Sequence, residues 1–126
     1  MRTHFLKDLA IEGREAVLDV LPEFDFYRLG KVSCLLVKEE RDGGSIDLSL
    51  TADYDDSSSG TTEVALRFNR ARYAKLPELM PVFFLSELEI EDIRSDQIEG
   101  VSYRARDYGE SDFEVLARDI AISLVR

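Results

Sequence analysis

Few side chains in this sequence combine the residue types and the spacing that catalysis requires. The only histidine, His4, lies close to the N-terminus, where a chain often frays, and this is a poor place for a general base. The serines at 57–59 follow Asp55 and Asp56. A nucleophilic serine needs a base with a pKa near neutrality, and the carboxylates of a loop are too acidic for that role. The sequence therefore predicts no catalytic residue and a protein that is not an enzyme.

Residues that bind metal ions are equally scarce. Transition-metal sites use histidine or cysteine, and the sequence contains one of each. A calcium loop that begins at Asp53 would carry glycine at its sixth position and glutamate at its twelfth, where this sequence has Ser58 and Val64. We therefore predict no metal site and no cofactor, and leave open whether the loop at 53–57 holds a cation.

The charge of the chain favours a basic partner. Its 26 acidic residues outnumber its 16 basic ones, which gives a formal net charge of −10 at pH 7. A surface this negative repels nucleic acids and anionic membranes and attracts basic proteins. Acidic side chains also have two structural uses, because they keep a protein soluble and protect the edges of its sheets.

Two acidic groups stand out along the sequence. In the first, five acidic residues and no Lys or Arg lie between positions 47 and 63. In the second, three glutamates alternate along one strand at a spacing of about 7 Å, where they repel one another unless a partner supplies the opposite charge. We predict a partner-binding surface made of these residues: Asp53, Asp55, Asp56, Glu87, Glu89 and Glu91.

The elements that must position these residues are one helix and a series of strands. Leu9, Val17 and Leu18 recur at helical spacing, so we expect a helix at about 7–21 that ends before Pro22. From Lys31 onward, apolar residues alternate with polar ones, as in strands that bury one face. The expected strands lie at about 32–37, 46–54, 64–68, 84–93, 100–105 and 113–124.

Three of these strands carry further predictions. The run at 32–37 is apolar on both faces, so we expect a central strand with Cys34 buried in the core. In the strand at 84–93, the alternation places Phe84 inward and the glutamates outward. In the last strand, the set of inward residues changes phase near Ala117, which predicts a bulge there.

These elements predict one domain over residues 1–126, of the α+β class and mostly β. Short turn-bearing segments join the strands, and no helix long enough for a parallel crossover separates them. We therefore expect an antiparallel meander sheet of about six strands with one N-terminal helix packed on it. The apolar content of 44% fits a globular domain, and a single cysteine excludes a disulfide within the chain. No targeting segment or membrane span is visible, so we expect a cytoplasmic protein.

The C-terminal half carries a family resemblance. The residues that carry it are Val64-Ala65-Leu66-Arg67-Phe68, Leu88-Glu89-Ile90-Glu91-Asp92-Ile93, Gln97-Ile98-Glu99-Gly100-Val101-Ser102-Tyr103, Asp107-Tyr108 and Arg118-Asp119-Ile120. In these patterns the chain resembles small β-rich bacterial immunity proteins of polymorphic-toxin and contact-dependent growth inhibition systems. The resemblance implies a cytoplasmic inhibitor that binds one cognate toxin domain, often a nuclease, and blocks its active site. No binding residue is carried over from the family.

We therefore expect a non-catalytic inhibitor that binds a basic protein, such as a toxin domain, through an acidic surface. Two alternatives stay open. The first is a ligand-binding or enzymatic domain that uses the inward surface of the sheet with Phe24, Phe26 and Tyr27, for which we would expect a deep apolar pocket with convergent polar groups. The second is a structural subunit that associates with itself. The sequence does not predict the oligomeric state.

Overall fold

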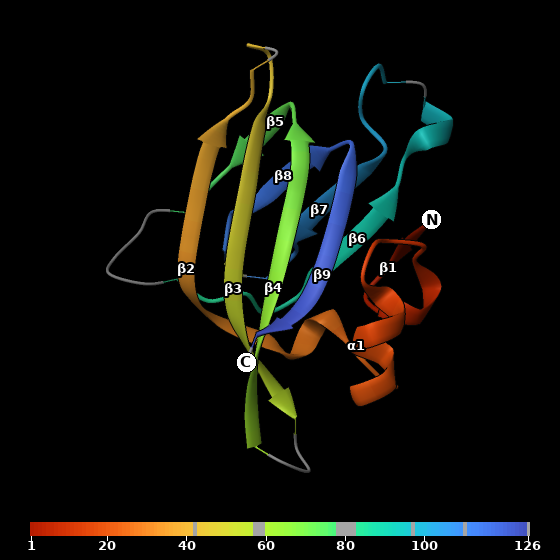
Figure 1. Cartoon of the computed structure of the whole chain (residues 1–126), viewed down its shortest axis with the longest axis vertical. Helices are drawn as coiled ribbons and strands as arrows, with labels where there is room; N and C mark the ends of the chain where they lie inside the picture. The colour runs from red at the N-terminus through yellow and green to blue at the C-terminus, as the bar shows by residue number, and fades with distance from the viewer. Residues whose placement is uncertain (42, 57–59, 78–82, 97, 110, 126) are drawn as a thin grey trace.

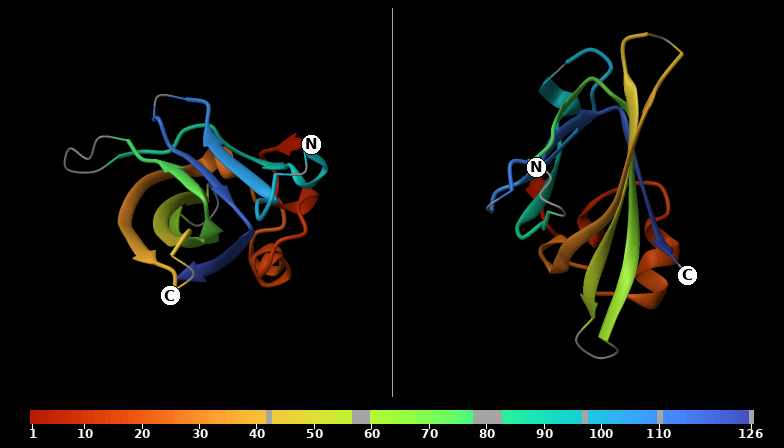
Figure 2. Two further views of the ribbon diagram at one scale, coloured as in Figure 1. Left: turned by 90° about the horizontal axis from the view of Figure 1, so that it is seen from above. Right: turned by 90° about the vertical axis from the view of Figure 1, so that its left-hand side faces the viewer.

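Within the residues that the structure describes, two antiparallel sheets pack face to face in this computed structural model (Figure 1, Figure 2). The described residues are 1–41, 43–56, 60–77, 83–96, 98–109 and 111–125. The first sheet has the order β2–β3–β4–β9, with strands Leu29–Glu39, Ile46–Asp56, Gly60–Ala71 and Asp119–Val125. The second has the order β1–β6–β7–β8–β5, with strands Arg2–Thr3, Leu88–Asp92, Tyr103–Asp107, Glu114–Ala117 and Tyr73–Lys75.

The predicted class, α+β and mostly β, is confirmed, whereas the single meander sheet of about six strands is wrong. Two of the predicted strands bend and cross between the sheets: β4 continues into β5 after Arg72, and β8 continues into β9 after Arg118. Hydrogen bonds carry the pairing through both bends, since the amide of Arg72 donates to the carbonyl of Leu116 at 2.9 Å and that of Arg118 to Asn69 at 3.1 Å. As a result β4 pairs with β9 and not with the next long strand along the chain. Strands that switch sheets in this way form the corners of orthogonal sandwiches.

The predicted irregularity near Ala117 is present as a one-residue break at Arg118. Val115 and Ala117 are buried before the break, and Ile120 and Ile122 are buried after it. The alternation therefore changes phase by one residue, which lets the same chain segment present its apolar side to the core from both sheets.

The core lies between the two sheets and contains the large aromatic side chains. Phe68 and Phe113 come from opposite sheets or their flanks and meet with ring centroids 5.9 Å apart. Phe24 and Phe26 are also fully buried, and Phe24 stacks on Tyr54 at 4.4 Å. The ligand-binding alternative thus loses two of the three aromatic residues that it invoked, because they fill the core.

The N-terminal helix is shorter than predicted. The helix α1 covers Arg14–Val20 and ends just before Pro22, as expected, but the predicted residues before it are not helical. Instead Leu6–Asp8 form a short 3-10 turn (η1), and Glu12 bonds to the edge of β9, where the amide of Ile122 donates to its carbonyl at 2.9 Å. Gly13 allows this approach, since its φ is +86° and a Cβ there would lie 1.9 Å from the Ile122 carbonyl oxygen.

Two further 3-10 turns complete the described secondary structure. They are η2 at Phe26–Arg28 and η3 at Arg94–Asp96. Helix α1 packs beside β9, at one side of the four-stranded sheet (Figure 1). No helix in the described part of the chain is long and apolar enough to cross a membrane.

β2 is an edge strand, so the prediction of a central strand at 32–37 is wrong. Cys34, expected in the core, is exposed, as are Leu36 and Val37. The pairing of β2 with β3 shifts register between Val32 and Cys34, which places Cys34 and Leu36 on the outer face of the sheet. An apolar run is compatible with two buried faces and with an uncovered edge, and the sequence does not distinguish them.

Phe84 points outward and is 58% exposed, which contradicts the prediction that it faces inward. The segment at 83–85 does not continue the alternation of β6. It pairs with the start of β2 instead, where the amide of Val32 donates to the carbonyl of Phe83 at 3.0 Å. Because the segment changes partner, Phe83 and Leu85 are the residues that it buries.

Candidate functional site

The first predicted acidic group lies on the outer face of the four-stranded sheet. Ala52 and Tyr54 point into the core, so the alternation of β3 turns Asp53 and Asp55 to the opposite face. The residue directly across from Asp53 on β4 is Glu63. Two carboxylates therefore stand opposite each other, an arrangement that destabilises a strand pair by roughly 0.2–1 kcal/mol.

No cation neutralises this like-charged pair within the described residues. Among the described residues, no hydrogen bond or ion pair reaches the carboxylate of Asp53 or Asp55. Glu63 accepts only a long hydrogen bond of 3.4 Å from the hydroxyl of Ser33. The guanidinium of Arg28 donates to the backbone carbonyl of Asp55 at 3.3 Å, and not to its side chain. Within the described residues, the carboxylates of Asp53 and Asp55 are thus not paired with any basic side chain.

Asp56 occupies a different environment at the end of β3. It is half-buried and lines a surface cavity of about 320 Å³ together with Arg28 and Tyr54. Burial raises the pKa of Tyr54, whose hydroxyl accepts a hydrogen bond of 3.0 Å from the amide of Asp25. Asp56 therefore lies where the end of β3 meets the N-terminal segment, on the side of the strand opposite to Asp53 and Asp55.

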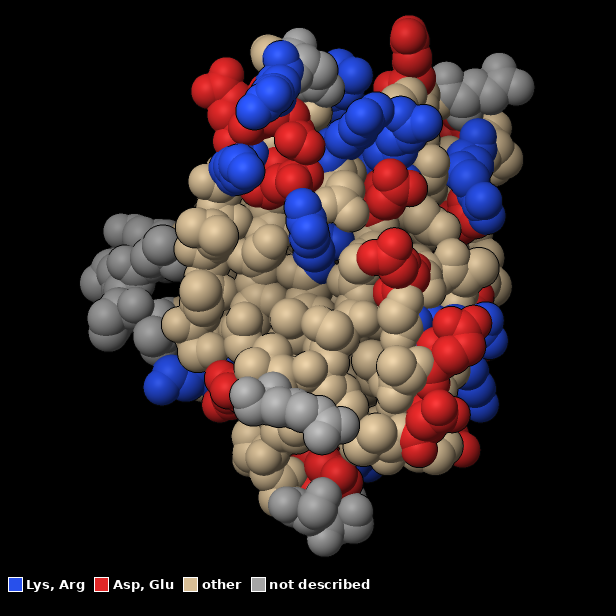
Figure 3. Space-filling view, viewed as in Figure 1, with Lys and Arg blue, Asp and Glu red and all other residues tan. Residues whose placement is uncertain are grey.

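The face that carries Asp53 and Asp55 is uncovered by any described element. Its middle is a row of small uncharged side chains, which are Cys34, Thr51, Ala65 and Ser123, and in the next row Arg67 lies between Ser49 and Ala121. Figure 3 shows this uncharged area, with charged side chains gathered beyond it toward the β2–β3 hairpin. There Arg67 neutralises Asp47 at 3.0 Å. This open face therefore combines an uncharged middle with the acids Asp53 and Asp55 at one end, which no described side chain pairs.

The second predicted acidic group lies on the outer face of the other sheet and is neutralised there. Glu91 stands opposite Arg104, whose guanidinium lies 3.2 Å from its carboxylate. Glu89 stands opposite Arg106 and forms an ion pair of 2.7 Å with Arg2. Opposite charges directly across a strand pair stabilise a sheet. Glu89 and Glu91 are therefore members of cross-strand ion pairs.

Glu87 lies before β6 and is exposed, and its amide donates to Asp107 at 2.9 Å. The two predicted groups occupy the outer faces of opposite layers, so they do not form one surface (Figure 2). The structure places Asp53 and Asp55 on one face and Asp56 beside Tyr54 at the end of the same strand, and it separates all three from the glutamates. The sequence contains Arg104 and Arg106, but it does not show that they face the glutamates, because the register of β6 and β7 is a tertiary property.

His4 is held firmly in place, contrary to the expectation of a frayed end. Its Nδ1 lies 2.7 Å from the carboxylate of Asp25, and its ring stacks on Tyr27 with centroids 3.8 Å apart. The hydroxyl of Tyr27 donates to Glu89, and this hydrogen bond, together with burial, raises the pKa of Tyr27 to about 12. The pairing of β1 with β6 fixes the segment that carries His4.

No group of three or more His, Cys, Asp or Glu residues in the described part of the chain is arranged to hold a metal ion. The loop at 53–57, left open above as a cation site, lies partly outside the described residues.

Comparison with known proteins finds no family model, curated protein or solved structure that matches this chain. The resemblance to immunity proteins therefore rests on the sequence patterns alone.

Proposed function

We propose that this chain is a non-catalytic protein-binding domain, an inhibitor of the immunity type, which docks a basic protein on the outer face of its four-stranded sheet. The observation that carries the proposal is the like-charged pair of Asp53 and Glu63, extended by Asp55, on an uncovered sheet face. Folding gains nothing from two opposed carboxylates. A partner with Lys or Arg at this position removes the repulsion, so the arrangement favours binding over stability.

The chemistry of the partner follows from the charge of this face. A nuclease domain holds phosphate with a basic cleft, and an acidic chain of net charge −10 is complementary to it. Complementary charges raise the association rate and exclude wrong partners more than they raise affinity. Because exposed charges are screened beyond about 8 Å at physiological ionic strength, association should slow as salt is added.

The test is capture of the partner with a variant in which the acidic end is neutral. The immobilised chain is exposed to a lysate of its host at low and moderate salt, and bound proteins are identified by mass spectrometry. We expect one basic protein, and an association rate about tenfold lower for the variant Asp53→Asn, Asp55→Asn, Glu63→Gln. The same variant should be more stable to urea by several tenths of a kcal/mol, since the repulsion is gone.

A matched control removes three exposed acids elsewhere, through Glu87→Gln, Glu99→Gln and Asp112→Asn. This control changes the net charge equally but leaves the proposed face intact, so it should bind at close to the normal rate. It also tests Glu87 as a docking residue. Equal rates for the wild type and the Asp53 variant would refute the proposed docking face.

A further inference from the structure

The face that carries Asp53 and Asp55 also carries basic side chains, which gather at its opposite end. Figure 3 shows charged side chains of both signs at this end, toward the β2–β3 hairpin and beyond the uncharged area. The basic ones are Lys38, Arg67, Arg70 and, at the adjoining bend, Arg118, and the acidic ones are Asp47 and Asp119. The proposed function uses the acidic end of the face and leaves this end without a role.

A bulge in β4 places Arg70 on this face. Phe68 and Ala71 both point into the core, so the two residues between them lie together on the outer side of the sheet. The amide of Arg70 donates to the carboxylate of Asp47 at 3.4 Å. Its guanidinium forms no ion pair or hydrogen bond within the part of the chain that the structure describes. The charge of Arg70 is therefore exposed and unbalanced.

Arg70 also has a backbone conformation that disfavours arginine. Its φ is +52°, and no other non-glycine residue of the described chain has a positive φ. Glycine adopts this left-handed conformation freely, whereas a side chain raises its free energy. Strained positions of this kind cluster where a protein binds a ligand or a partner. The guanidinium of Arg70 is thus a candidate for contact with a partner.

The other cations at this end differ in how far they are neutralised. Arg67 pairs with Asp47 at 3.0 Å, so its charge is balanced within the sheet. Lys38 stands opposite the same Asp47, but no ion pair joins them. Arg118 is exposed, and its amide donates to the carbonyl of Asn69 at 3.1 Å, which holds it beside the bulge. Among the described residues, its guanidinium has no ionic partner. This end of the face therefore carries unpaired positive charge.

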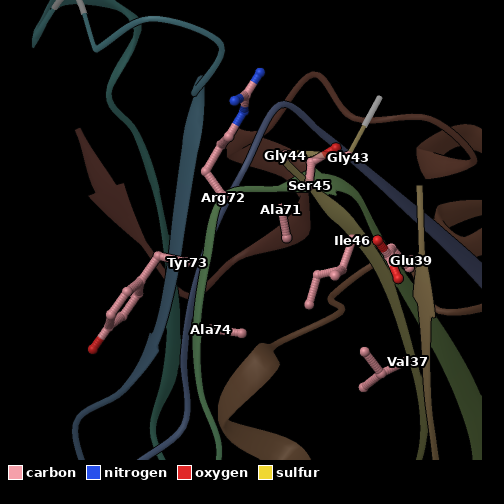
Figure 4. Close-up of a pocket in the computed structure, with 10 residues that line it drawn as sticks. All are labelled: Val37, Glu39, Gly43, Gly44, Ser45, Ile46, Ala71, Arg72, Tyr73 and Ala74. Carbon is pink, nitrogen blue, oxygen red and sulfur yellow. The ribbon is translucent and has the colours of Figure 1, made fainter. Parts of the chain in front are cut away.

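Arg72 does not belong to this positive end. It follows Ala71 at the bend into β5 and lies at the rim of a groove of about 580 Å³ on the inner side of the sheet. The apolar walls of the groove include Val37, Ile46 and Ala74, and Figure 4 shows Arg72 directed away from them. The groove is thus separate from the docking face, and the positive end is limited to the bulge and its neighbours.

The two charged ends are close enough to lie within one interface. Glu63 and Arg70 are seven residues apart on β4, which is about 20 Å along a strand. An interface of ordinary size buries about 800 Å² of each partner, a patch roughly 30 Å across. A protein centred on the uncharged middle of the face therefore touches both ends. A partner that is basic throughout would bring like charge against Arg70, and complementary interfaces avoid such contacts.

We propose that the protein that binds this face carries two sites of opposite charge about 20 Å apart: a basic site that meets the like-charged acids, and a carboxylate site that meets Arg70 and Arg118. This inference rests on the proposed function, since it describes the partner of the same face. A guanidinium suits a carboxylate because it binds both oxygens through two parallel hydrogen bonds. The second site also fixes the orientation of the partner, since the reverse orientation brings like charges together at both ends.

A second copy of this chain is the other occupant that these charges allow. A copy turned by 180° would set its acids against Arg70 and its cations against Asp53. Each copy carries a net charge of −10, however, so two copies repel each other. A basic partner does not meet this repulsion, and the charge of the chain therefore favours a different protein.

The test uses three synthetic peptides and the ¹⁵N-labelled chain at low salt. One peptide has three arginines and one has three glutamates. The last has both blocks, joined by about ten Gly and Ser residues with a mean span of about 17 Å. We expect the arginine peptide to shift the amide signals of Asp53 and Glu63, and the glutamate peptide to shift those of Arg70 and Arg118. The two-block peptide should bind at least about fivefold more tightly than either single block.

The outcomes separate this proposal from the proposed function. A glutamate peptide that shifts neither Arg70 nor Arg118, or a two-block peptide that binds no more tightly than the arginine peptide, refutes the carboxylate site and leaves the docking face standing. An arginine peptide that leaves Asp53 and Glu63 unshifted refutes the docking face itself. A dimer in light scattering that Arg70→Gly dissociates would assign the face to a second copy and overturn the proposal.

Variants connect the effect to the two guanidiniums. Arg70→Gly with Arg118→Gln should lower the affinity of the two-block peptide to that of the arginine peptide. The control, Lys7→Gln with Lys75→Gln, removes the same charge from exposed positions elsewhere and should retain the tighter binding. Because glycine adopts the conformation of residue 70, Arg70→Gly alone should unfold at a urea concentration equal to or above that of the wild type. An equal loss of affinity in the control, or a lower midpoint for Arg70→Gly, would contradict the binding role given to Arg70.

Discussion

Asp107 is the one buried charged side chain among the described residues, with an exposed fraction of 4%. Its carboxylate accepts hydrogen bonds from the amides of Ser86 (3.2 Å), Glu87 (2.9 Å) and Gly109 (2.8 Å). The hydroxyl of Ser111 also donates to it. The side chain thus ties the approach to β6 to the turn that joins β7 and β8. We predict that Asp107→Ala is among the most destabilising substitutions in the chain.

The magnitude follows from these contacts. A hydrogen bond to a charged group contributes about 1.5–3 kcal/mol, and a donor that stays buried without a partner loses more than one that water can reach. Ser86 and Glu87 are exposed residues, so their amides regain water when the carboxylate is removed, while the half-buried turn at Gly109 and Ser111 regains less. We therefore expect a loss of about 3 kcal/mol, below the value that the separate bonds would give if they were additive.

The assay is urea unfolding followed by far-ultraviolet circular dichroism, since the chain contains no tryptophan. With a denaturant slope of about 2 kcal/mol per molar urea, Asp107→Ala should lower the midpoint by about 1.5 M. Asp107→Asn keeps one acceptor oxygen and should lose about half as much. The exposed Asp112→Ala, in the same turn, is the control and should stay within about 0.5 kcal/mol of the wild type. A change this small for Asp107→Ala would refute the structural role given to its carboxylate.

Two further predictions concern the N-terminal segment. Gly13→Ala should destabilise the chain by at least about 2 kcal/mol in the same urea assay, because φ at this position is +86° and the new Cβ would meet the carbonyl of Ile122. An unfolding midpoint equal to that of the wild type would show that the segment is free to move off β9. Tyr27 should add a step to alkaline unfolding. Its pKa is raised from 10.0 to about 12 in the folded chain, so its stabilising contribution is complete below pH 10 and is lost as the pH rises toward 12. Circular dichroism across this range should show the step in the wild type and not in Tyr27→Phe, and a step of equal size in both would contradict the assignment.

Local periodicity was sufficient to predict much of this molecule. The alternation of β3 places Leu50 and Ala52 in the core and Asp53 on the outer face, as the sequence indicates. The end of α1 before Pro22 and the phase change near Ala117 follow from local signals as well. Each of these properties depends on residues within a few positions of one another, so the chain determines them before any strand finds its partner.

Where a segment changes its hydrogen-bonding partner, periodicity alone leads to errors. Phe84 shares the parity of Leu88 and Ile90, yet it points outward because the segment at 83–85 pairs with β2 instead of continuing β6. Cys34 lies in an apolar run, yet it is exposed because that run forms an edge. A run of apolar residues indicates a strand, but it does not show which of its faces another layer will cover.

The sequence by itself determined the acidity of the chain, its mostly β class and the face of each strand on which the acidic residues lie. Only the tertiary structure decided what stands opposite them. Glu91 meets Arg104, 13 residues away, and forms an ion pair with it, whereas Asp53 meets another acid, Glu63. The physical reason is that side-chain direction depends on the local backbone, while the identity of a cross-strand neighbour depends on register and on which strands bend between sheets. The same alternation of acids can therefore produce ion pairs or a like-charged pair, and here the register separates the two cases.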